Sequence, residues 1–167
     1  MAVAPDIFRS VLGSFATGVA VVTTRLGDEV HGTTMSAFAS VSLVPPFVLI
    51  CVDRSSESHD LISQSGVFAV NILHDGQSDL SASLSTKATL ELAATHKLDG
   101  TGHSPGVTGA PILDEKLAYV DCRVVNTIEA GDHRLYIGRV EDAWASGADV
   151  RPLVYFRGKY AGLPTDD

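Results

Sequence analysis

The stretch that most constrains the fold of this chain runs from residue 31 to residue 46, HGTTMSAFASVSLVPP. Its residues alternate in character, as in a β-strand whose successive side chains point to opposite faces of a sheet. One face carries four hydroxyl groups and one aromatic ring, and no charge. We expect a half-buried strand whose polar face could hold a flat, hydrogen-bonding ligand. A hydroxyl-rich strand without a ligand is the simpler alternative, because threonine favours strands. The polar face consists of Thr34, Ser36, Phe38, Ser40 and Ser42.

Short strands joined by turns are expected on both sides of this stretch. Pro45 and Pro46 end it, because proline cannot donate a hydrogen bond to a sheet. The continuous apolar run at 47–52 is typical of a strand buried on both faces. About seven short antiparallel strands favour a closed, mainly β barrel over a parallel sheet. The other strands are expected at 19–24, 67–73, 118–128, 135–145 and 153–156.

Helices are expected at the beginning of the chain and in two insertions. Apolar residues recur at helical spacing through 5–17, and Gly18 would release the chain into the next strand. A short helix is expected to begin after Ser55 or Ser56 and to stop at Gly66. Residues 75–98 have a helical pattern with a break near residue 85, and 99–111 is predicted to be a loop.

Composition narrows the possible architecture and partners. The length suits one domain over residues 1–167, and 45% hydrophobic residues support a real core. Charged residues make up only 19%, so part of the surface is expected to pack against a second copy in a homodimer. The net charge of −8, with only 12 basic residues, argues against nonspecific nucleic-acid binding.

The cysteines and the apolar stretches point to a reduced, cytoplasmic protein. Cys51 and Cys122 each lie in an apolar run and are expected to be small core residues. The spacing of cysteine and histidine does not suggest a metal site, so none is expected. We also expect no membrane span, because no apolar run is long enough, and no signal peptide.

The first candidate site follows the apolar run at 47–52. Arg54, Ser55 and Ser56 lie where a strand ends and a helix begins, so a guanidinium, two hydroxyls and free backbone N–H groups would converge. Such a combination binds phosphate. The plainer alternative is an ordinary serine cap beside a surface arginine. Since only four residues separate Ser42 from Phe47, the hydroxyl face and this anion site could lie on one side of the sheet.

Two further segments could contribute to a site. In Gly131-Asp132-His133, a turn would present an imidazole at the mouth of a pocket, where it can donate a hydrogen bond. The alternative is a turn followed by an exposed strand residue. The segment 156–160, FRGKY, could fold over a bound ring or form a cationic, aromatic strand end. A hydrolase triad, paired carboxylates and a GxGxxG motif are all absent from the sequence.

These segments, in this order, resemble the short-chain flavin reductases of two-component monooxygenases, which have the FMN-binding split-barrel fold. The resemblance covers nearly the whole chain. It is carried by FRSVLGSFATGVAVVTT (8–24), GTTMSAFASVSLVPPFVLICV (32–52), SSESHDLI (55–62), GAPIL (109–113), and then DCRV, GDH and LVYFRGKY. It implies a mainly β, antiparallel Greek-key-type split barrel that forms a homodimer.

The resemblance also assigns roles to residues. It implies that His133 lies beside the nicotinamide as the catalytic residue. Phe15, Thr17, Arg157 and Tyr160 would line the same site. Methionine at 35 and alanine at 37 depart from the usual small residue and serine, which implies that backbone N–H groups hold the ring more than hydroxyls do. Flavin binding is assigned to Thr34, Met35, Ser36, Ala37, Ser40, Val41 and Ser42 around the ring, and to Asp53, Arg54, Ser55 and Ser56 around the phosphate.

The implied activity is an NAD(P)H:flavin oxidoreductase. It would reduce FMN or FAD with NADH or NADPH and supply the reduced flavin to a partner monooxygenase. Hydride passes from nicotinamide C4 to flavin N5, so the cofactors carry the chemistry and the protein stacks the two rings. The alternative is a non-catalytic flavin- or haem-binding split-barrel carrier or sensor. The choice of flavin, of nicotinamide and of oxygenase partner is left open by the sequence.

Overall fold

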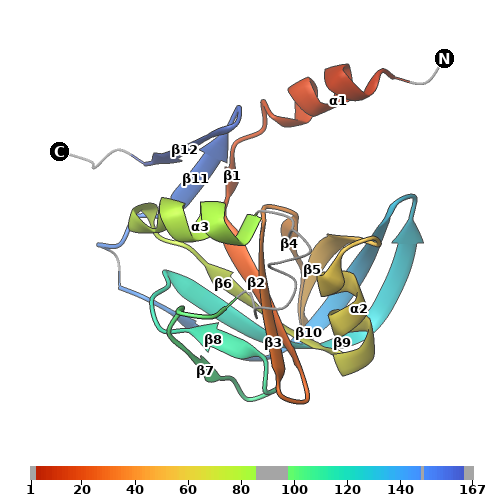
Figure 1. Cartoon of the computed structure of the whole chain (residues 1–167), viewed down its shortest axis with the longest axis vertical. Helices are drawn as coiled ribbons and strands as arrows, with labels where there is room; N and C mark the ends of the chain where they lie inside the picture. The colour runs from red at the N-terminus through yellow and green to blue at the C-terminus, as the bar shows by residue number, and fades with distance from the viewer. Residues whose placement is uncertain (1–2, 86–97, 148, 164–167) are drawn as a thin grey trace.

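The computed structural model describes residues 3–85, 98–147 and 149–163. Its largest unit is a seven-stranded antiparallel sheet (Figure 1) with the strand order β3-β2-β6-β9-β10-β5-β4. The strands of this sheet are β2 (Ala20–Leu26), β3 (Glu29–Met35), β4 (Phe38–Leu43), β5 (Pro46–Asp53), β6 (Val67–Ile72), β9 (Ala118–Ala130) and β10 (His133–Ala145).

The two edge strands of this sheet, β3 and β4, are consecutive in the chain. Only Ser36 and Ala37 separate them, so the sheet must curl until its two edges come close. The edges are not hydrogen-bonded to each other, which leaves the barrel split at this point. The mainly β, antiparallel split barrel expected from the sequence is therefore confirmed.

The barrel core is closely packed around Phe68. This ring is fully buried in one cluster with Ile50 of β5 and Tyr136 of β10. A Cβ at Gly138 would lie 2.4 Å from Cζ of Phe68, so only glycine fits opposite the ring. In an interior packed this closely, a larger side chain forces the neighbouring residues to move.

Two small sheets accompany the barrel. One consists of β1 (Thr17–Gly18), β11 (Leu153–Phe156) and β12 (Lys159–Gly162), in the order β1-β11-β12. The other pairs β7 (His103–Pro105) with β8 (Pro111–Leu113). The sequence predicted β11 with its observed bounds, but it treated 157–160 as a tail and 99–111 as a loop, where the structure has strands β12 and β7.

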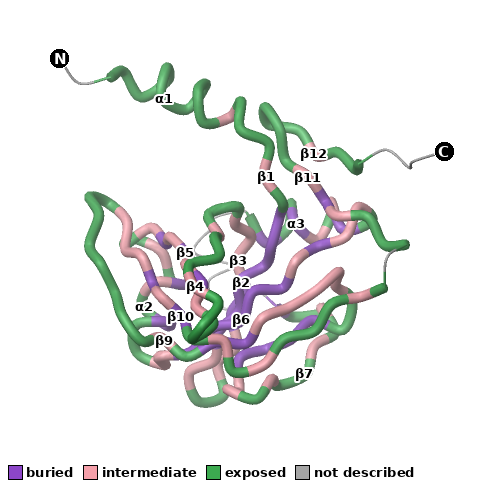
Figure 2. Tube along the Cα trace, turned by 180° about the vertical axis from the view of Figure 1, so that it is seen from behind, coloured by how far each residue is buried: buried purple, intermediate pink, exposed green. Residues whose placement is uncertain are grey.

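The three α-helices differ in how they pack. Helix α2 (Glu57–Ser65) lies against β2, is capped by Ser56, and ends at Gly66 with a left-handed φ of 68°. Helix α3 (Ser78–Ser85) follows the 3₁₀ turn η1 (Asp75–Gln77). Helix α1 (Pro5–Leu12) contains no buried residue and projects from the body of the molecule (Figure 2). No helix of the described ranges is long and apolar enough to cross a membrane.

Three expectations about local structure were wrong or incomplete. The helix expected over 5–17 ends at Leu12, because Gly13 begins the turn that lets Thr17 pair with Tyr155. The strand at 47–52 alternates between buried and half-buried residues, so only one of its faces is fully covered. Helix α3 is described over Ser78–Ser85, and most of the remaining helical pattern, 86–97, lies outside the described residues.

The stretch at 31–46 is two strands rather than one. It breaks after Met35, and the second strand is the exposed edge β4. The apolar face expected to be covered is open at this edge, where Leu43 is 86% exposed. The alternation continues across the break, so it could not reveal that β3 and β4 belong to opposite edges of the barrel.

Candidate active site

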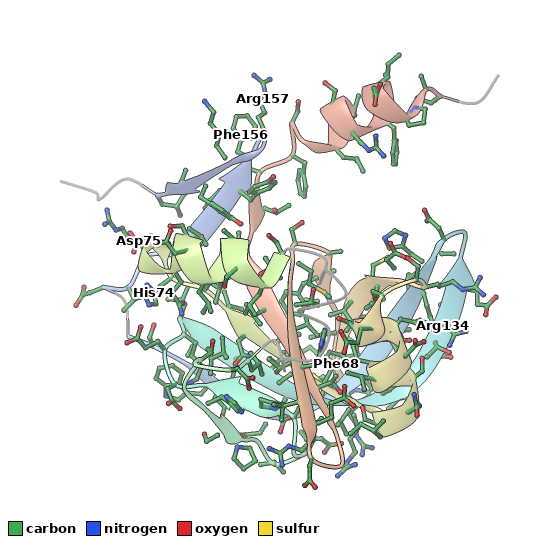
Figure 3. All side chains as sticks on the ribbon, viewed as in Figure 1. Phe68, His74, Asp75, Arg134, Phe156 and Arg157 are labelled. Carbon is green, nitrogen blue, oxygen red and sulfur yellow. The ribbon has the colours of Figure 1, made fainter. Side chains whose placement is uncertain are left out.

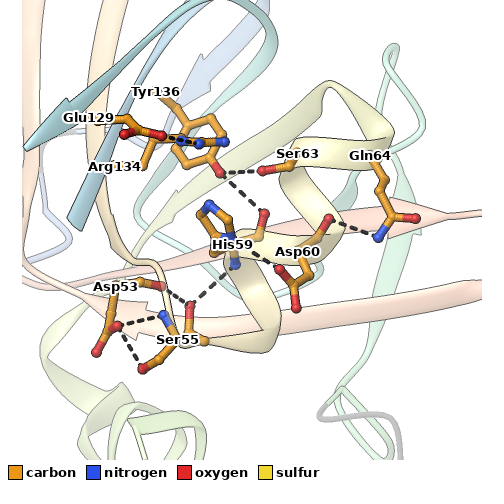
Figure 4. Close-up of polar contacts among 10 residues, drawn as sticks. Asp53, Ser55, His59, Asp60, Ser63, Gln64, Glu129, Arg134 and Tyr136 are labelled. Carbon is orange, nitrogen blue, oxygen red and sulfur yellow. Dashed lines mark hydrogen bonds and ion pairs between the residues drawn. The ribbon is translucent and has the colours of Figure 1, made fainter. Parts of the chain in front are cut away.

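The residues between β5 and α2 form a compact polar turn, which we call the Asp53–Ser56 corner (Figure 4). Oδ1 of Asp53 accepts hydrogen bonds from both the backbone N–H and the hydroxyl of Ser55, each at 2.8 Å. Ser56 donates its hydroxyl to the carbonyl oxygen of Asp53 and accepts from the N–H of His59. Of the two serines that the sequence offered as the helix cap, Ser56 is the one that caps α2 and fixes its first turn.

Arg54 projects from this corner toward the end of β9. Its guanidinium lies 3.8 Å from Oε2 of Glu129, and its side chain is about half exposed, at 46%. Glu129 also accepts a hydrogen bond of 2.8 Å from Arg134 (Figure 4). This hydrogen bond and the charge of Arg54 hold the pKa of Glu129 below its ordinary value. Glu129 is therefore ionised at neutral pH.

The turn that contains His133 lies directly beside the corner. His133 is paired with Asp53 in the β5–β10 register, and the N–H of Arg54 donates to the carbonyl oxygen of Asp132 at 3.0 Å. Nδ1 of His133 is 2.7 Å from Oδ1 of Asp132. That hydrogen bond and the charge of the imidazole lower the pKa of Asp132. Two motifs that are distant in the sequence are thus neighbours in the fold.

A cavity of about 230 Å³ opens beside the corner, and we call it the β3–β5 cavity. Four of the predicted site residues line it: Thr34, Met35, Asp53 and Ser56. Cys51 also reaches its wall rather than lying in the core, and burial and the charge of Asp132 raise the pKa of its thiol. The remaining lining residues are His31, Thr33, Val52, Glu57, Ser58 and Ser85.

A second cavity, of about 320 Å³, adjoins the first at Met35, and we call it the β1 cavity. It is lined by Phe15 and Thr17 from the segment around β1, and by Ser36 and Phe38 at the break between β3 and β4. Phe15 and Thr17, predicted site residues, therefore line a cavity that shares Met35 with the β3–β5 cavity. Pockets for small ligands commonly span 300–1,000 Å³, so the two cavities together have the size of such a site.

The hydroxyl groups predicted to share one face do not all meet. Thr34 donates its hydroxyl to the carbonyl oxygen of Ser81, at 2.8 Å. Ser40, Val41 and Ser42 lie on edge strand β4, where the register with β5 shifts between the two serines. These three residues line neither cavity, and Ala37 lies in the connection between the strands. The prediction of a continuous polar face was wrong for the second half of the stretch.

The two predicted residues near the end of the chain have different surroundings. The hydroxyl of Tyr160 lies 2.8 Å from Oγ of Ser81, the residue whose carbonyl oxygen binds Thr34. Arg157 lies at the outer tip of the β11–β12 sheet, with its guanidinium over the ring of Phe156 (Figure 3). Tyr160 is therefore connected to the wall of the β3–β5 cavity, whereas Arg157 lines a separate cavity with Arg9.

Sequence reasoning missed the buried histidine behind the β3–β5 cavity. His31 is 3% exposed; its Nε2 is 2.8 Å from Oγ of Ser58, and its Nδ1 is 3.6 Å from a carboxylate oxygen of Glu57. His31 has the same parity in the alternating stretch as Thr33 and Met35, which was the available signal that it points inward. It joins β3 to the first turn of α2.

The donor groups of this region suit an anionic ring compound such as a flavin nucleotide. The Arg54 guanidinium, the Ser55 N–H and the positive end of the α2 dipole gather at one point. The cavities beside it are lined largely by small or apolar groups, with Met35 between them. Within the described residues, no three histidine, cysteine, aspartate or glutamate side chains gather as a metal site would require.

Comparison with known proteins identifies the family. The model of the flavin reductase like domain matches residues 12–164. The reductase subunit HsaB of a flavin-dependent monooxygenase from Mycobacterium tuberculosis is 39% identical over 160 residues, covering 95% of this chain and 82% of that protein. An NADH-dependent flavin reductase from a Rhodococcus species is 36% identical, covering 96% of this chain and 88% of the relative.

A solved structure agrees with these relatives. The NADH:FAD oxidoreductase SgcE6 from Streptomyces globisporus, in complex with NAD and FAD fragments, superimposes with a TM-score of 0.88 at 30% identity. The match covers 99% of this chain and 98% of that one. With a family model spanning most of the chain and full-length relatives above 35% identity, the chain belongs to the flavin reductase-like domain family.

Proposed function

We propose that this protein is an NADH-dependent flavin reductase that supplies reduced flavin to a partner monooxygenase. The observation that carries the proposal is family membership over residues 12–164, together with relatives named as reductases that match this chain over 82% and 88% of their own length. The donor groups at the Asp53–Ser56 corner and the adjoining cavities fit the flavin that such a reaction requires.

The flavin phosphate is proposed to bind at the corner. Arg54 supplies a half-exposed guanidinium, and Ser55 supplies an N–H and a hydroxyl near the N-terminus of α2. Charge-assisted hydrogen bonds of this kind are about twice as strong as neutral ones. The phosphate would thereby anchor one end of the flavin beside the β3–β5 cavity.

The flavin ring is proposed to lie in the β3–β5 cavity, against Met35 and the adjoining β1 cavity. The bound flavin and nicotinamide supply the hydride chemistry, so the protein itself needs no acid or base. Its task is to hold the two rings in contact and to exclude water. His133 is partly exposed beside the corner, where its imidazole can orient the nicotinamide amide or its ribose.

FAD or FMN is proposed as the flavin, and NADH as the preferred reductant. The relative SgcE6, solved with NAD and FAD fragments, supports FAD and NADH. The net charge of −8 also disfavours the additional phosphate of NADPH, because the overall field opposes further negative charge.

The decisive assay is NADH oxidation, followed by absorbance, with added FMN or FAD. We expect oxidation far above a flavin-only blank. If neither flavin accelerates the oxidation of NADH or NADPH, the reductase function is wrong. Tight retention of flavin or haem through purification, without nicotinamide oxidation, would favour the carrier or sensor alternative.

The protein is further proposed to act as a homodimer. The apolar face of α1 has no covering within the described chain: Ile7, Phe8 and Leu12 are each more than half exposed. Leu43 and Val44, at the tip of β4, are more than 85% exposed. Light scattering is expected to give a molar mass of twice the 17.6 kDa of one chain. The double variant Phe8→Glu, Leu12→Glu should have the mass of a single chain. A monomeric unmodified protein would contradict the proposal.

We also propose that residues 1–167 act as one catalytic domain in the cytoplasm. The family model spans most of this length, which supports a single functional unit. Both cysteines are free thiols, which fits a reducing compartment. Fractionation of the source cells with an antibody to the protein would test the location.

A further inference from the structure

The groups proposed to receive the flavin phosphate are already paired with carboxylates of the same chain. The N–H and hydroxyl of Ser55 both donate to Oδ1 of Asp53, at 2.8 Å. The guanidinium of Arg54 faces Oε2 of Glu129, at 3.8 Å. Each hydrogen-bond donor proposed for the phosphate therefore already faces a carboxylate.

A carboxylate and a phosphate monoester compete for the same donors. Both are anionic oxygen acceptors, and a donor N–H or O–H turned toward one is lost to the other. The two anions also repel each other, and a phosphate monoester carries nearly two negative charges at neutral pH. For a phosphate to bind Ser55 and Arg54 fully, the carboxylates of Asp53 and Glu129 must give up part of these contacts.

We propose that Asp53 and Glu129 are built-in competitors for the flavin phosphate, which keep the affinity for flavin nucleotides low and so promote their release. This inference rests on the proposed function, in which reduced flavin must leave the enzyme. It assigns the competition to the phosphate: the carboxylates lower the affinity for FMN much more than the affinity for riboflavin, which has no phosphate.

The local hydrogen bonds of both residues can form without the negative charge. The turn from Asp53 to Ser55 is one in which an asparagine side chain accepts the same N–H hydrogen bond. Glu129 is 62% exposed, and a glutamine there keeps an amide oxygen for Arg134. The variants Asp53→Asn and Glu129→Gln therefore remove charge while preserving shape and hydrogen-bond acceptors.

The test compares the affinities for FMN and riboflavin, measured by quenching of flavin fluorescence without nicotinamide. For Asp53→Asn and for Glu129→Gln, we expect FMN to bind about fivefold more tightly. The affinity for riboflavin should change by less than about twofold, even though Asp53 lines the β3–β5 cavity, because the oxidised ring carries no charge. Asp28→Asn, at the exposed turn between β2 and β3, is the matched control for a change of one unit in net charge. It should leave both affinities within about twofold, because exposed distant charges are screened.

Arg54→Gln separates this inference from the proposed phosphate site. If the site is right, Arg54→Gln weakens FMN about tenfold and leaves riboflavin unchanged. Unchanged FMN binding in Arg54→Gln would overturn both the site and the inference. Weaker FMN binding in Arg54→Gln, together with unchanged or weaker FMN binding in Asp53→Asn and Glu129→Gln, would overturn the inference alone, and Asp53 would then be a scaffold for the corner.

Discussion

Two polar regions of the barrel, the Asp53–Ser56 corner and the strand pair β3–β4, are built in opposite ways. In the corner, consecutive residues bond to one another and to the neighbouring turn at Asp132, so their polar groups gather at one point. In β3 and β4, the polar side chains are divided between the two edges of the split sheet. Thr34 bonds inward to Ser81, whereas Ser40 lies on the exposed edge.

This difference indicates how the two ends of a flavin would be recognised. The corner can recognise charge, because it combines a guanidinium, an N–H and a helix end. The β3–β4 region can recognise shape and offer backbone groups, since the Thr34 hydroxyl is bonded to Ser81, and Ser40 and Ser42 line neither cavity. Losses of affinity should therefore be large and phosphate-dependent at the corner, and small at the hydroxyls.

The largest loss of stability is expected in the barrel core, away from both polar regions. It serves as a reference for the effects of substitutions in those regions. In Gly138→Ala the new Cβ would press on Phe68 at 2.4 Å, and overpacking of this kind costs about 1–3 kcal/mol. Urea unfolding should show this loss. The ratio of FMN to riboflavin affinity should not change, because the substitution touches neither polar region. A shifted ratio would mean that core packing sets phosphate recognition.

His133→Ala tests the corner from its nicotinamide side. Loss of one charged or hydrogen-bonding imidazole should raise KM for NADH about tenfold. FMN affinity should change by less than about twofold, since His133 bonds to Asp132 rather than to the phosphate donors. Steady-state kinetics and flavin titration together measure both quantities. Equal losses in both would refute the role assigned to the histidine.

Thr34→Val tests the β3–β4 side. The substitution removes the hydrogen bond to Ser81, which should cost about 1 kcal/mol of stability. Flavin affinity should fall by less than about twofold, because the hydroxyl serves the scaffold. Thermal unfolding and flavin titration provide the two measurements. A large loss of flavin affinity with normal stability would show that the hydroxyl binds the ring.

The serines of edge strand β4 should matter less still. Ser40→Ala and Ser42→Ala are each expected to change flavin affinity by less than about twofold, within the range of surface substitutions. The same flavin titration, on riboflavin and FMN, measures this. If either variant lost tenfold in affinity for riboflavin, the ring would extend along β4 and the assignment to the β3–β5 cavity would be wrong.

Acid should lower the stability of the fold slightly through carboxylates beside the Asp53–Ser56 corner, and less through β3–β4. Hydrogen bonds from Arg134 and His133 lower the pKa values of Glu129 and Asp132, so these groups stabilise the fold while ionised. Their contribution is present above the ordinary carboxylate pKa values of about 4 and is lost as pH falls through the lowered ones. Unfolding by urea between pH 7 and pH 3 should show a shallower acid loss in Glu129→Gln. An identical pH dependence would contradict this assignment.

Local signals in the sequence were enough to predict the structure around the Asp53–Ser56 corner. They were not enough to predict that the polar residues of 31–46 are divided between β3 and β4. Ser56 and Gly66 mark the beginning and end of α2 in any context, because capping and a left-handed turn are local. The pairing of Thr34 with Ser81, and the placement of β3 and β4 at opposite edges, depend on the order of strands in the sheet. Alternation with the same parity on both sides of Ser36 concealed the break.

The amphipathic pattern of α1 shows a second limit. Its spacing predicted a helix with an apolar face, and that helix forms over Pro5–Leu12. The spacing does not indicate what covers this apolar face. Within the described residues of one chain, no residue of α1 is buried. The cavity residue His31 was missed for a related reason, since its contacts with Glu57 and Ser58 join segments that only the fold brings together.

A crystal structure of the protein with FMN would locate both ends of the flavin. We expect phosphate oxygens within hydrogen-bond distance of the Arg54 guanidinium and the Ser55 N–H, with the ring in the cavity beside Met35. A phosphate bound elsewhere, with Ser55 still bonded to Asp53 and the β3–β5 cavity empty of the ring, would contradict it.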